Sequence, residues 1–461
     1  MADTHLTIDP SSPAIAPVRG DSIATEDAQV SLPLWLREIM DQTLLRIQNH
    51  RTEEPNIPKD PEPNIIEVPG ELWVKKEECY SPLAVSIGPF HYSDREGKLQ
   101  QVEELKDRMM LKFVEDTPRK YLYANVKEEL QKARGCYPKY IRKKFSDEEF
   151  IKMMFIDGCF ILQFMHCLVN ESEKLEMSEQ QIFHVKRDLL LLENQLPFAV
   201  LYSLRKLRKC FVPFGNSIHV SLDWSPPPEK TQPAHLLQLL YYKSMYHYSK
   251  RNHKKARPGS RGHGLYYSAK NPKKAGILFR PRWTGAITDV KFKRSVLSGK
   301  VEVPPIIIDE STESLLLNLV AYESAAALDQ FWVSSYILFM DSLIDDAEDV
   351  KEMRSNGIII NYLGADHKVA KLFNGMGESL THDTYHTYDI AAYNDVKMAI
   401  NKQCESTVKR WAYEWKKTYF SNPWTFITVL AASFGLCLTA TQTYYTRFPP
   451  KLDDYCKCIN S

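Results

Sequence analysis

Apolar residues recur at intervals of three and four along most of the chain between residues 99 and 419. That spacing puts them on one face of a helix, so it predicts amphipathic helices packed around a core. Ser146 followed by Glu149 forms a capping box, which predicts the start of one of these helices. The predicted helices cover residues 99–114, 121–133, 147–169, 180–193, 313–327, 333–345, 368–373 and 389–419.

Strand signals are few and short. Residues 65–69 form one short apolar run, and residues 301–309 form another that is kinked by Pro304 and Pro305. The sequence therefore predicts a mainly α fold, with a multi-helix globular body and a few short β-strands.

Residues 418–446 contain no charged side chain. A helix that spans a membrane needs about 20 mostly apolar residues. Trp424 at one end and Tyr444 with Tyr445 at the other are typical of aromatic anchors at the membrane interface. We therefore predict a transmembrane helix at 420–446, followed by a short tail at 447–461. The alternative is a core helix of a globular protein, since the threonines lower the hydropathy.

The flanks of this segment predict its orientation. Residues 1–29 lack the apolar run of a secretory signal, and positive charge favours the cytoplasmic side of a membrane. We therefore predict a single-pass protein whose large N-terminal body is cytoplasmic. The basic residues upstream are Lys402, Lys409, Arg410, Lys416 and Lys417, and those downstream are Arg447, Lys451 and Lys457.

Three small residues, Ala431, Gly435 and Thr439, lie four apart in the predicted membrane helix. Small residues at that spacing let two helices approach closely, so they indicate a homo-oligomer that packs through this helix. The alternative is that they serve no partner. A second apolar stretch, 153–169, carries Asp157 near one end and is interpreted as a core helix, because a carboxylate inside a membrane costs several kcal/mol.

The rest of the chain divides into two predicted regions. Residues 1–64 are polar and rich in proline, which predicts disorder, with a short amphipathic helix near 32–47. Residues 65–419 form the predicted helical domain, with a basic loop at 250–282. That loop holds eleven Lys or Arg and no acidic residue.

The charge balance limits the partners of the chain. It has 59 basic and 58 acidic residues, so a general nucleic-acid binder is not expected. The basic loop is a candidate contact for an anionic membrane surface. The alternatives are binding of nucleic acid and a solvated loop without a partner. The residues of this candidate contact are Lys250, Arg251, Lys254, Lys255, Arg257 and Arg261.

No pattern in the sequence predicts a cofactor, a metal site or a catalytic residue. His382 and His386 lie four apart, but a third ligand is missing from their neighbourhood. The nine cysteines are scattered without a C-x-x-C motif, which indicates reduced thiols.

The segment DLLLLENQLPFAVL, residues 188–201, places Glu193, Asn194 and Gln195 directly after four leucines. Pro197 cannot continue a helix but suits the first turn of the next one. We therefore interpret the three polar residues as closing a break between two core helices, where backbone groups lack helical partners. The alternative is that the buried carboxylate performs acid–base chemistry in a hydrolase or transferase.

Eight motifs in consistent order resemble one plant family, the domain-of-unknown-function 247 family (DUF247), also called the UPF0481 type. This resemblance implies a mostly helical body with a C-terminal membrane helix and supplies no catalytic residues. Some grass members resemble determinants of self-incompatibility, which implies recognition. The motifs are VSIGPFHY (85–92), RGCY (134–137), MMFIDGCFIL (153–162), DLLLLENQLPFAVL (188–201), VPPIIIDESTE (303–313), GIIINYLG (357–364), VAKLFN (369–374) and YFSNPW (419–424).

Two positions depart from the family pattern. Members usually carry a second histidine where this chain has Tyr92, and an acidic segment where it has residues 268–274. The second departure extends the basic loop. The sequence and the resemblance together predict a membrane-anchored recognition or signalling protein that acts through protein partners.

Overall fold

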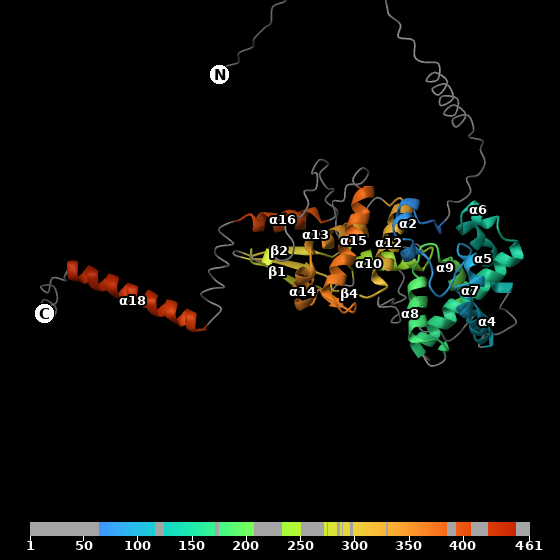
Figure 1. The fold of residues 1–461 in the computed structure, drawn as a ribbon, viewed down its shortest axis with the longest axis horizontal. Coiled ribbons are helices and arrows are strands. Elements are labelled where there is room, and N and C mark those ends of the chain that lie inside the picture. Colours follow the sequence, from blue (N-terminus) through green and yellow to red (C-terminus); the bar gives the residue numbers. More distant parts are fainter. Residues whose placement is uncertain are drawn as a thin grey trace, which may run out of the picture. The chain divides into compact units, whose positions relative to one another are not determined.

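The computed structural model describes residues 64–448, with gaps at 116–123, 171–174, 207–232, 250–271, 385–392 and 407–422 and short ones at 274, 284–285, 288, 296–297 and 329–330. All described residues belong to one compact unit, Pro61–Ser461. Helices predominate and a few short strands accompany them, which confirms the predicted mainly α fold (Figure 1). The helix predicted at 32–47 lies outside the described residues.

One hydrophobic core lies among the helices of the first half of the chain. The long helix α7 packs against α4, α5 and α9 (Figure 1). Its side chains Phe160 and Phe164 are fully buried, as the interpretation of 153–169 as a core helix requires. The helices of this part are α4 (Gln100–Glu115), α5 (Ala124–Ala133), α6 (Lys139–Arg142), α7 (Asp147–Asn170), α8 (Glu179–Asp188) and α9 (Phe198–Lys206), with two 3-10 helices, η1 (Tyr92–Glu96) and η3 (Arg134–Cys136).

The predicted capping box at the start of α7 is confirmed. The backbone N–H of Glu149 donates to Ser146 Oγ at 3.2 Å, and the N–H of Ser146 donates to Glu149 Oε2 at 2.8 Å. Two N–H groups that a helix start leaves without a helical acceptor are therefore bonded.

A second core forms around α12 (Thr312–Ala325). Every residue of this helix from Leu316 to Glu323 is buried, so this part of the helix is covered on all sides. Glu323 accepts the N–H groups of Val333 and Ser334 at 2.7 and 3.0 Å and so caps the next helix from a distance. The elements of this part are α2 (Gly70–Lys75), α3 (Glu77–Tyr80), α10 (Leu236–Ser249), α12, α13 (Trp332–Leu343), α14 (Ala347–Ser355), α15 (Asp366–Thr384) and α16 (Asn394–Cys404).

Two small sheets pack against this second core. In the first, β3 (Gly299–Val303) lies between β1 (Ile277–Pro281), which is parallel to it, and β2 (Lys291–Arg294), which is antiparallel. In the second, β4 (Ile306–Ile308) pairs in parallel with β5 (Ile359–Asn361). The predicted strand at 301–309 is thus confirmed as two strands, separated by its prolines.

Several boundaries differ from the prediction. The helix predicted at 180–193 ends at Asp188, and the helix predicted at 368–373 extends over all of α15. No strand forms at 65–69, where Ile65 N–H donates to Cys136 O and Val68 N–H donates to a side chain. Those N–H groups are therefore not paired with a neighbouring strand.

Helix α18 (Pro423–Arg447) covers the predicted membrane segment from residue 423 onward, and residues 420–422 lie outside the described ones. It has 25 residues and no charge before Arg447, and its described side chains are almost all exposed. Among the described residues two stretches are long and apolar enough to cross a membrane. In Asp147–Leu168, 67% of the apolar stretch is buried, whereas in Ile427–Arg447 none is. Of these two described stretches, the one in α18 is therefore the one with an exposed apolar surface.

Two glycines in helices provide a matched test of packing. A Cβ on Gly158 in α7 would lie 2.4 Å from Leu204 Cδ1 of α9, whereas one on Gly375 in α15 meets no atom within 4 Å. We expect Gly158→Ala to lower the free energy of unfolding by about 1–3 kcal/mol through overpacking. Gly375→Ala should raise it by about 0.5–1 kcal/mol through helix propensity. Denaturant unfolding of both variants measures this, and equal effects would contradict close packing of α7 on α9.

Candidate functional site

The four leucines after Asp188 do not continue helix α8. Leu189 is its C-cap and the chain then turns until α9 begins at Phe198. All four leucines are nonetheless buried, at 5% exposure or less. The prediction of a helix up to Glu193 was wrong because side chains bond the carbonyls that a helix would use. Such local competition from amide side chains favours turns over helix.

Asn194 and Gln195 supply those competing bonds. Asn194 Nδ2 donates to the carbonyls of Asp188 and Val85 at 2.9 and 3.0 Å, and its Oδ1 accepts from Ile87 N–H at 2.6 Å. Gln195 Nε2 donates to the carbonyls of Leu189 and Leu191, and its Oε1 accepts from Leu237 N–H at 3.1 Å. Both amides are 1% exposed. They connect the end of α8 to residues 85–87 and to the start of α10.

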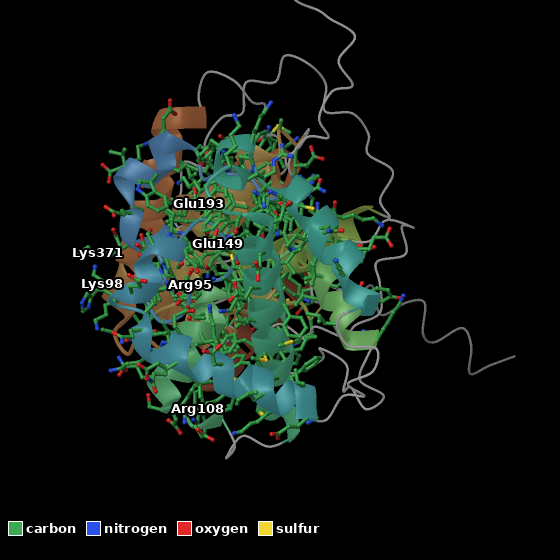
Figure 2. All side chains as sticks on the ribbon, turned by 90° about the vertical axis from the view of Figure 1, so that its right-hand side faces the viewer. Arg95, Lys98, Arg108, Glu149, Glu193 and Lys371 are labelled. Atoms are coloured by element: carbon green, nitrogen blue, oxygen red, sulfur yellow. The ribbon has the colours of Figure 1, made fainter. Side chains whose placement is uncertain are left out.

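Glu193 is nearer the surface than these amides. Its Oε1 accepts from Val68 N–H at 2.8 Å, just before α2, and its Oε2 lies 3.8 Å from His91 Nε2. Figure 2 shows Glu193 among the packed side chains of the body. Burial raises the pKa of Glu193 to about 7, although the hydrogen bond from Val68 lowers it. Burial likewise lowers the pKa of His91. Such a pair resembles a catalytic dyad, but one of the two Glu193 carboxylate oxygens, Oε1, already accepts the Val68 N–H group.

Asp188, which the sequence interpretation did not single out, binds more backbone than Glu193. Its Oδ2 accepts from three successive N–H groups, those of Leu83, Ala84 and Val85, at 2.9, 2.6 and 3.0 Å. Its Oδ1 pairs with Arg187 at 2.8 Å. A charged pair beside an unbroken run of leucines is the signal that could have indicated this role.

A third carboxylate completes the site. Asp157 of α7 is fully buried and pairs with Lys106 at 2.9 Å and with Arg95 at 2.7 Å, and it accepts Gly88 N–H at 2.8 Å. Burial would raise the pKa of Asp157, but these two cations and the N–H group outweigh it and hold that pKa below its usual value. Asp157 is therefore an ion-paired anchor inside the first core.

Gly88 shows how close the loop approaches this site. Its φ of +71° is in the left-handed region, and a Cβ there would lie 3.0 Å from both Gln195 O and Tyr137 Oη. Glycine is the residue that adopts this conformation without strain and leaves room for the contact. The backbone of the motif VSIGPFHY therefore lies close to the backbone of the segment at 193–195, where Gly88 approaches the Gln195 carbonyl.

A cavity of about 570 Å³ lies on the other side of α8. Asp309 lines it, whereas Glu193 and Asp157 do not. The Asp309 carboxylate accepts from Ser311 N–H, Ser311 Oγ and Thr312 Oγ1 at 2.8–3.0 Å, at the start of α12. It therefore holds the turn that leads into α12, and the described carboxylates do not converge in the cavity.

The remaining predicted site residues are distributed as follows. Pro197 lies immediately before α9, as expected for a residue that starts a new helix. Ala431, Gly435 and Thr439 lie on α18 and are exposed, and Thr439 Oγ1 donates to Gly435 O at 2.8 Å. Within the described residues no group of three metal-ligating side chains occurs. The six basic residues from Lys250 to Arg261 lie outside the described part of the chain.

Comparison with known proteins identifies the family. A family model described as a plant protein of unknown function, DUF247, matches residues 65–438. This chain belongs to the DUF247 family. The match includes the loop at 83–88, the segment at 188–197, the cavity and most of α18, so each of these is part of the DUF247 region.

Two relatives from Arabidopsis thaliana extend along most of this DUF247 chain. The UPF0481 protein At3g47200 is 29% identical over 82% of this chain and 85% of its own length. The putative UPF0481 protein At3g02645 is 21% identical over 91% of this chain and 96% of its own length. No solved structure matches. The names of these relatives state no activity.

Substitutions in the segment at 193–195 distinguish a structural role of its side chains from a catalytic role. Asn194→Ala removes three hydrogen bonds to buried backbone groups and leaves Ile87 N–H without its acceptor, so we expect it to lower the free energy of unfolding by about 3 kcal/mol or more. Glu193→Ala leaves one N–H group unpaired, with an expected loss of about 1–3 kcal/mol. Glu193→Gln keeps an acceptor for Val68 and is the matched control, with a smaller loss. Denaturant unfolding measures all three, and unchanged stability of Glu193→Ala with lost function would instead favour a chemical role.

Proposed function

We propose that this DUF247 protein is a membrane-anchored recognition or signalling protein that acts through protein partners. Helix α18 would hold it in a membrane by a single span. The large body before α18 would face the cytoplasm, and the tail after it would lie on the other side. The specific form implied by the family resemblance is recognition of the self-incompatibility type.

The observation that carries the proposal is the apolar surface of α18. Large apolar side chains remain open to solvent in this helix, including Phe434 and Leu436 at 68% and 72% exposure. In the described residues none of the stretch Ile427–Arg447 is covered by the chain itself. A contiguous apolar surface of this kind is stable in lipid or against a partner, not in water.

The hydrogen bonds of the helix also suit a membrane. Its polar side chains are mostly threonines, which donate to the carbonyls four residues earlier, as Thr439 does to Gly435 and Thr443 does to Thr439. Their hydroxyl groups therefore need no water. This supports lipid as the surroundings of α18 despite its moderate hydropathy.

The state of the carboxylates favours recognition over catalysis. Asp157 is ion-paired, and Asp188 and Glu193 accept backbone N–H groups. Asp309 accepts from Ser311 and Thr312 in the turn before α12. A general base must be free to accept a proton from a substrate that can reach it. These groups instead bond neighbouring backbone and side-chain groups. They therefore support a protein that acts by binding partners at its surface.

Two surfaces are the proposed contacts with partners. The first is the basic segment at 250–282, which was predicted as a loop but whose described end forms β1 (Ile277–Pro281). Arg280 of that strand is exposed, whereas the cations beside it pair with Asp289 or Glu302, namely Arg282, Lys293 and Lys300. The second is the face of α18 with Ala431, Gly435 and Thr439, on which a second copy of the chain could pack. The basic loop is suited to an acidic partner surface or an anionic leaflet.

A charge in the middle of α18 tests the anchor. Leu436→Arg in the full chain should cost about 2.5–3.5 kcal/mol at the centre of a span. We therefore expect most of that variant to be extracted from plant membranes by carbonate, while the wild type stays in the pellet. Thr446→Arg, near the end of the helix, is the control and should stay in the pellet.

A soluble wild-type chain would contradict the anchor. Orientation is measured on sealed vesicles with a protease added outside. We expect digestion of the N-terminal body on cytoplasmic-side-out vesicles, and its protection would reverse the proposed orientation.

Proximity labelling in plant tissue tests action through partners. A labelling enzyme fused to the N-terminus of the full chain should modify a reproducible set of proteins, including a second, differently tagged copy if α18 forms dimers. Replacing Lys250, Arg251, Lys254, Lys255, Arg257 and Arg261 by Gln should remove part of that set. The control is the same enzyme fused to residues 423–461 alone, and an identical set from this control would contradict the proposal.

A further inference from the structure

The cavity beside α8 has the size and walls of a ligand site. Its volume of about 570 Å³ is within the range of roughly 300–1,000 Å³ typical of pockets for small molecules. Helices α8, α10 and α12 and strand β4 supply apolar walls. The principal wall residues are Phe183, Leu190, Leu240, Ile306, Leu316 and Leu319. Walls of this kind exclude a polar or multiply charged ligand.

Among the described residues, one cation of these walls has no carboxylate partner. Lys186 lines the cavity on the same face of α8 as Phe183, one turn away, and it is half-buried. Burial alone lowers the pKa of Lys186, with no carboxylate of the described residues acting on it. A cation in that position is stabilised by any anion that enters the cavity.

The other charged groups of the wall are already engaged or exposed. Arg187 pairs with Asp188 and donates to the carbonyls of Ser81 and Glu78. Asp309 is held by the donors at the start of α12, and Glu179 is exposed in the first turn of α8. Among the described wall residues, Lys186 is therefore the cation without a carboxylate partner, while Asp309 and Glu179 keep their negative charges.

The open side of the cavity is marked by Trp283. This residue lines the cavity although its side chain is 79% exposed. An exposed aromatic ring at the edge of an apolar cavity can cover a ligand that enters from solvent or from lipid. The cavity is thus accessible, apolar along its walls and positive at one position.

We propose that this cavity binds a long-chain carboxylate, with its anionic head paired to Lys186 and its apolar chain between α8 and α12. The apolar walls match the chain, and the one cation without a carboxylate partner matches a head group with one negative charge. This inference is independent of the proposed membrane anchor, because the cavity belongs to the body and not to α18.

Photoaffinity labelling tests the proposal on the full chain. The protein is reconstituted in discs of zwitterionic lipid and exposed to hexadecanoate that carries a photoactivatable diazirine on its chain. We expect labelled peptides from α8 and α12, and competition by unlabelled hexadecanoate. Hexadecanol, which lacks the charge, should compete at least about tenfold less well, the factor of one charged hydrogen bond.

Variants of the cavity separate the head group from the chain. Lys186→Gln should reduce labelling of the α12 peptides at least about tenfold, and Lys186→Arg should restore most of it. Leu315→Trp, which fills the cavity, should abolish it. The matched control is Lys371→Gln on α15, at the edge of the body in Figure 2, and it should label like the wild type.

Three results would overturn the proposal. The first is labelling confined to α18, which would indicate binding from the bilayer alone. The second is equal competition by hexadecanol, which would show that the charge has no role. The third is full labelling of the α12 peptides in Lys186→Gln, because that variant retains every apolar wall of the cavity.

Discussion

The structure depends on the hydrogen bonds that buried side chains make to the backbone of residues 83–88. This segment is neither helix nor strand, yet it is almost entirely buried. Its N–H groups are accepted by Asp188, Asn194 and Asp157 from α8, from the turn after it and from α7. A buried N–H group without an acceptor would cost about 1–3 kcal/mol, so these side chains make the burial of the loop possible.

The same requirement explains where the charges of the interior lie. Two of the acceptors are carboxylates, and a carboxylate is buried only with partners that offset its desolvation. Arg187 serves Asp188, and Lys106 with Arg95 serves Asp157. The carboxylates that bond backbone therefore lie inside the packed interior, whereas the apolar cavity is lined by other residues of α8 and by α12. Arg187 of α8 belongs to both, since it pairs with Asp188 and also lines the cavity.

Prediction from the sequence succeeded where local periodicity decides the outcome. Helix α7 was predicted almost to the residue, because its apolar spacing and its capping box at Ser146 agree. Helix α8 ended five residues before its predicted end, because amide side chains bond the carbonyls that continuing the helix would have used. The segment at 65–69 formed no strand because a carboxylate, and no neighbouring strand, accepts Val68 N–H.

The sequence by itself determined the helical content, the apolar length of α18 and membership of the family, because each depends on stretches of residues that are contiguous in the chain. Only the tertiary structure decided which backbone groups Glu193, Asn194 and Gln195 bond, and that Lys186 faces a cavity. Ile87 and Asn194 are 107 residues apart, and Leu192 and Asn318 are 126 apart. Periodicity carries no information about such pairs, since they are set by how whole helices pack and by the need to bond every buried polar group.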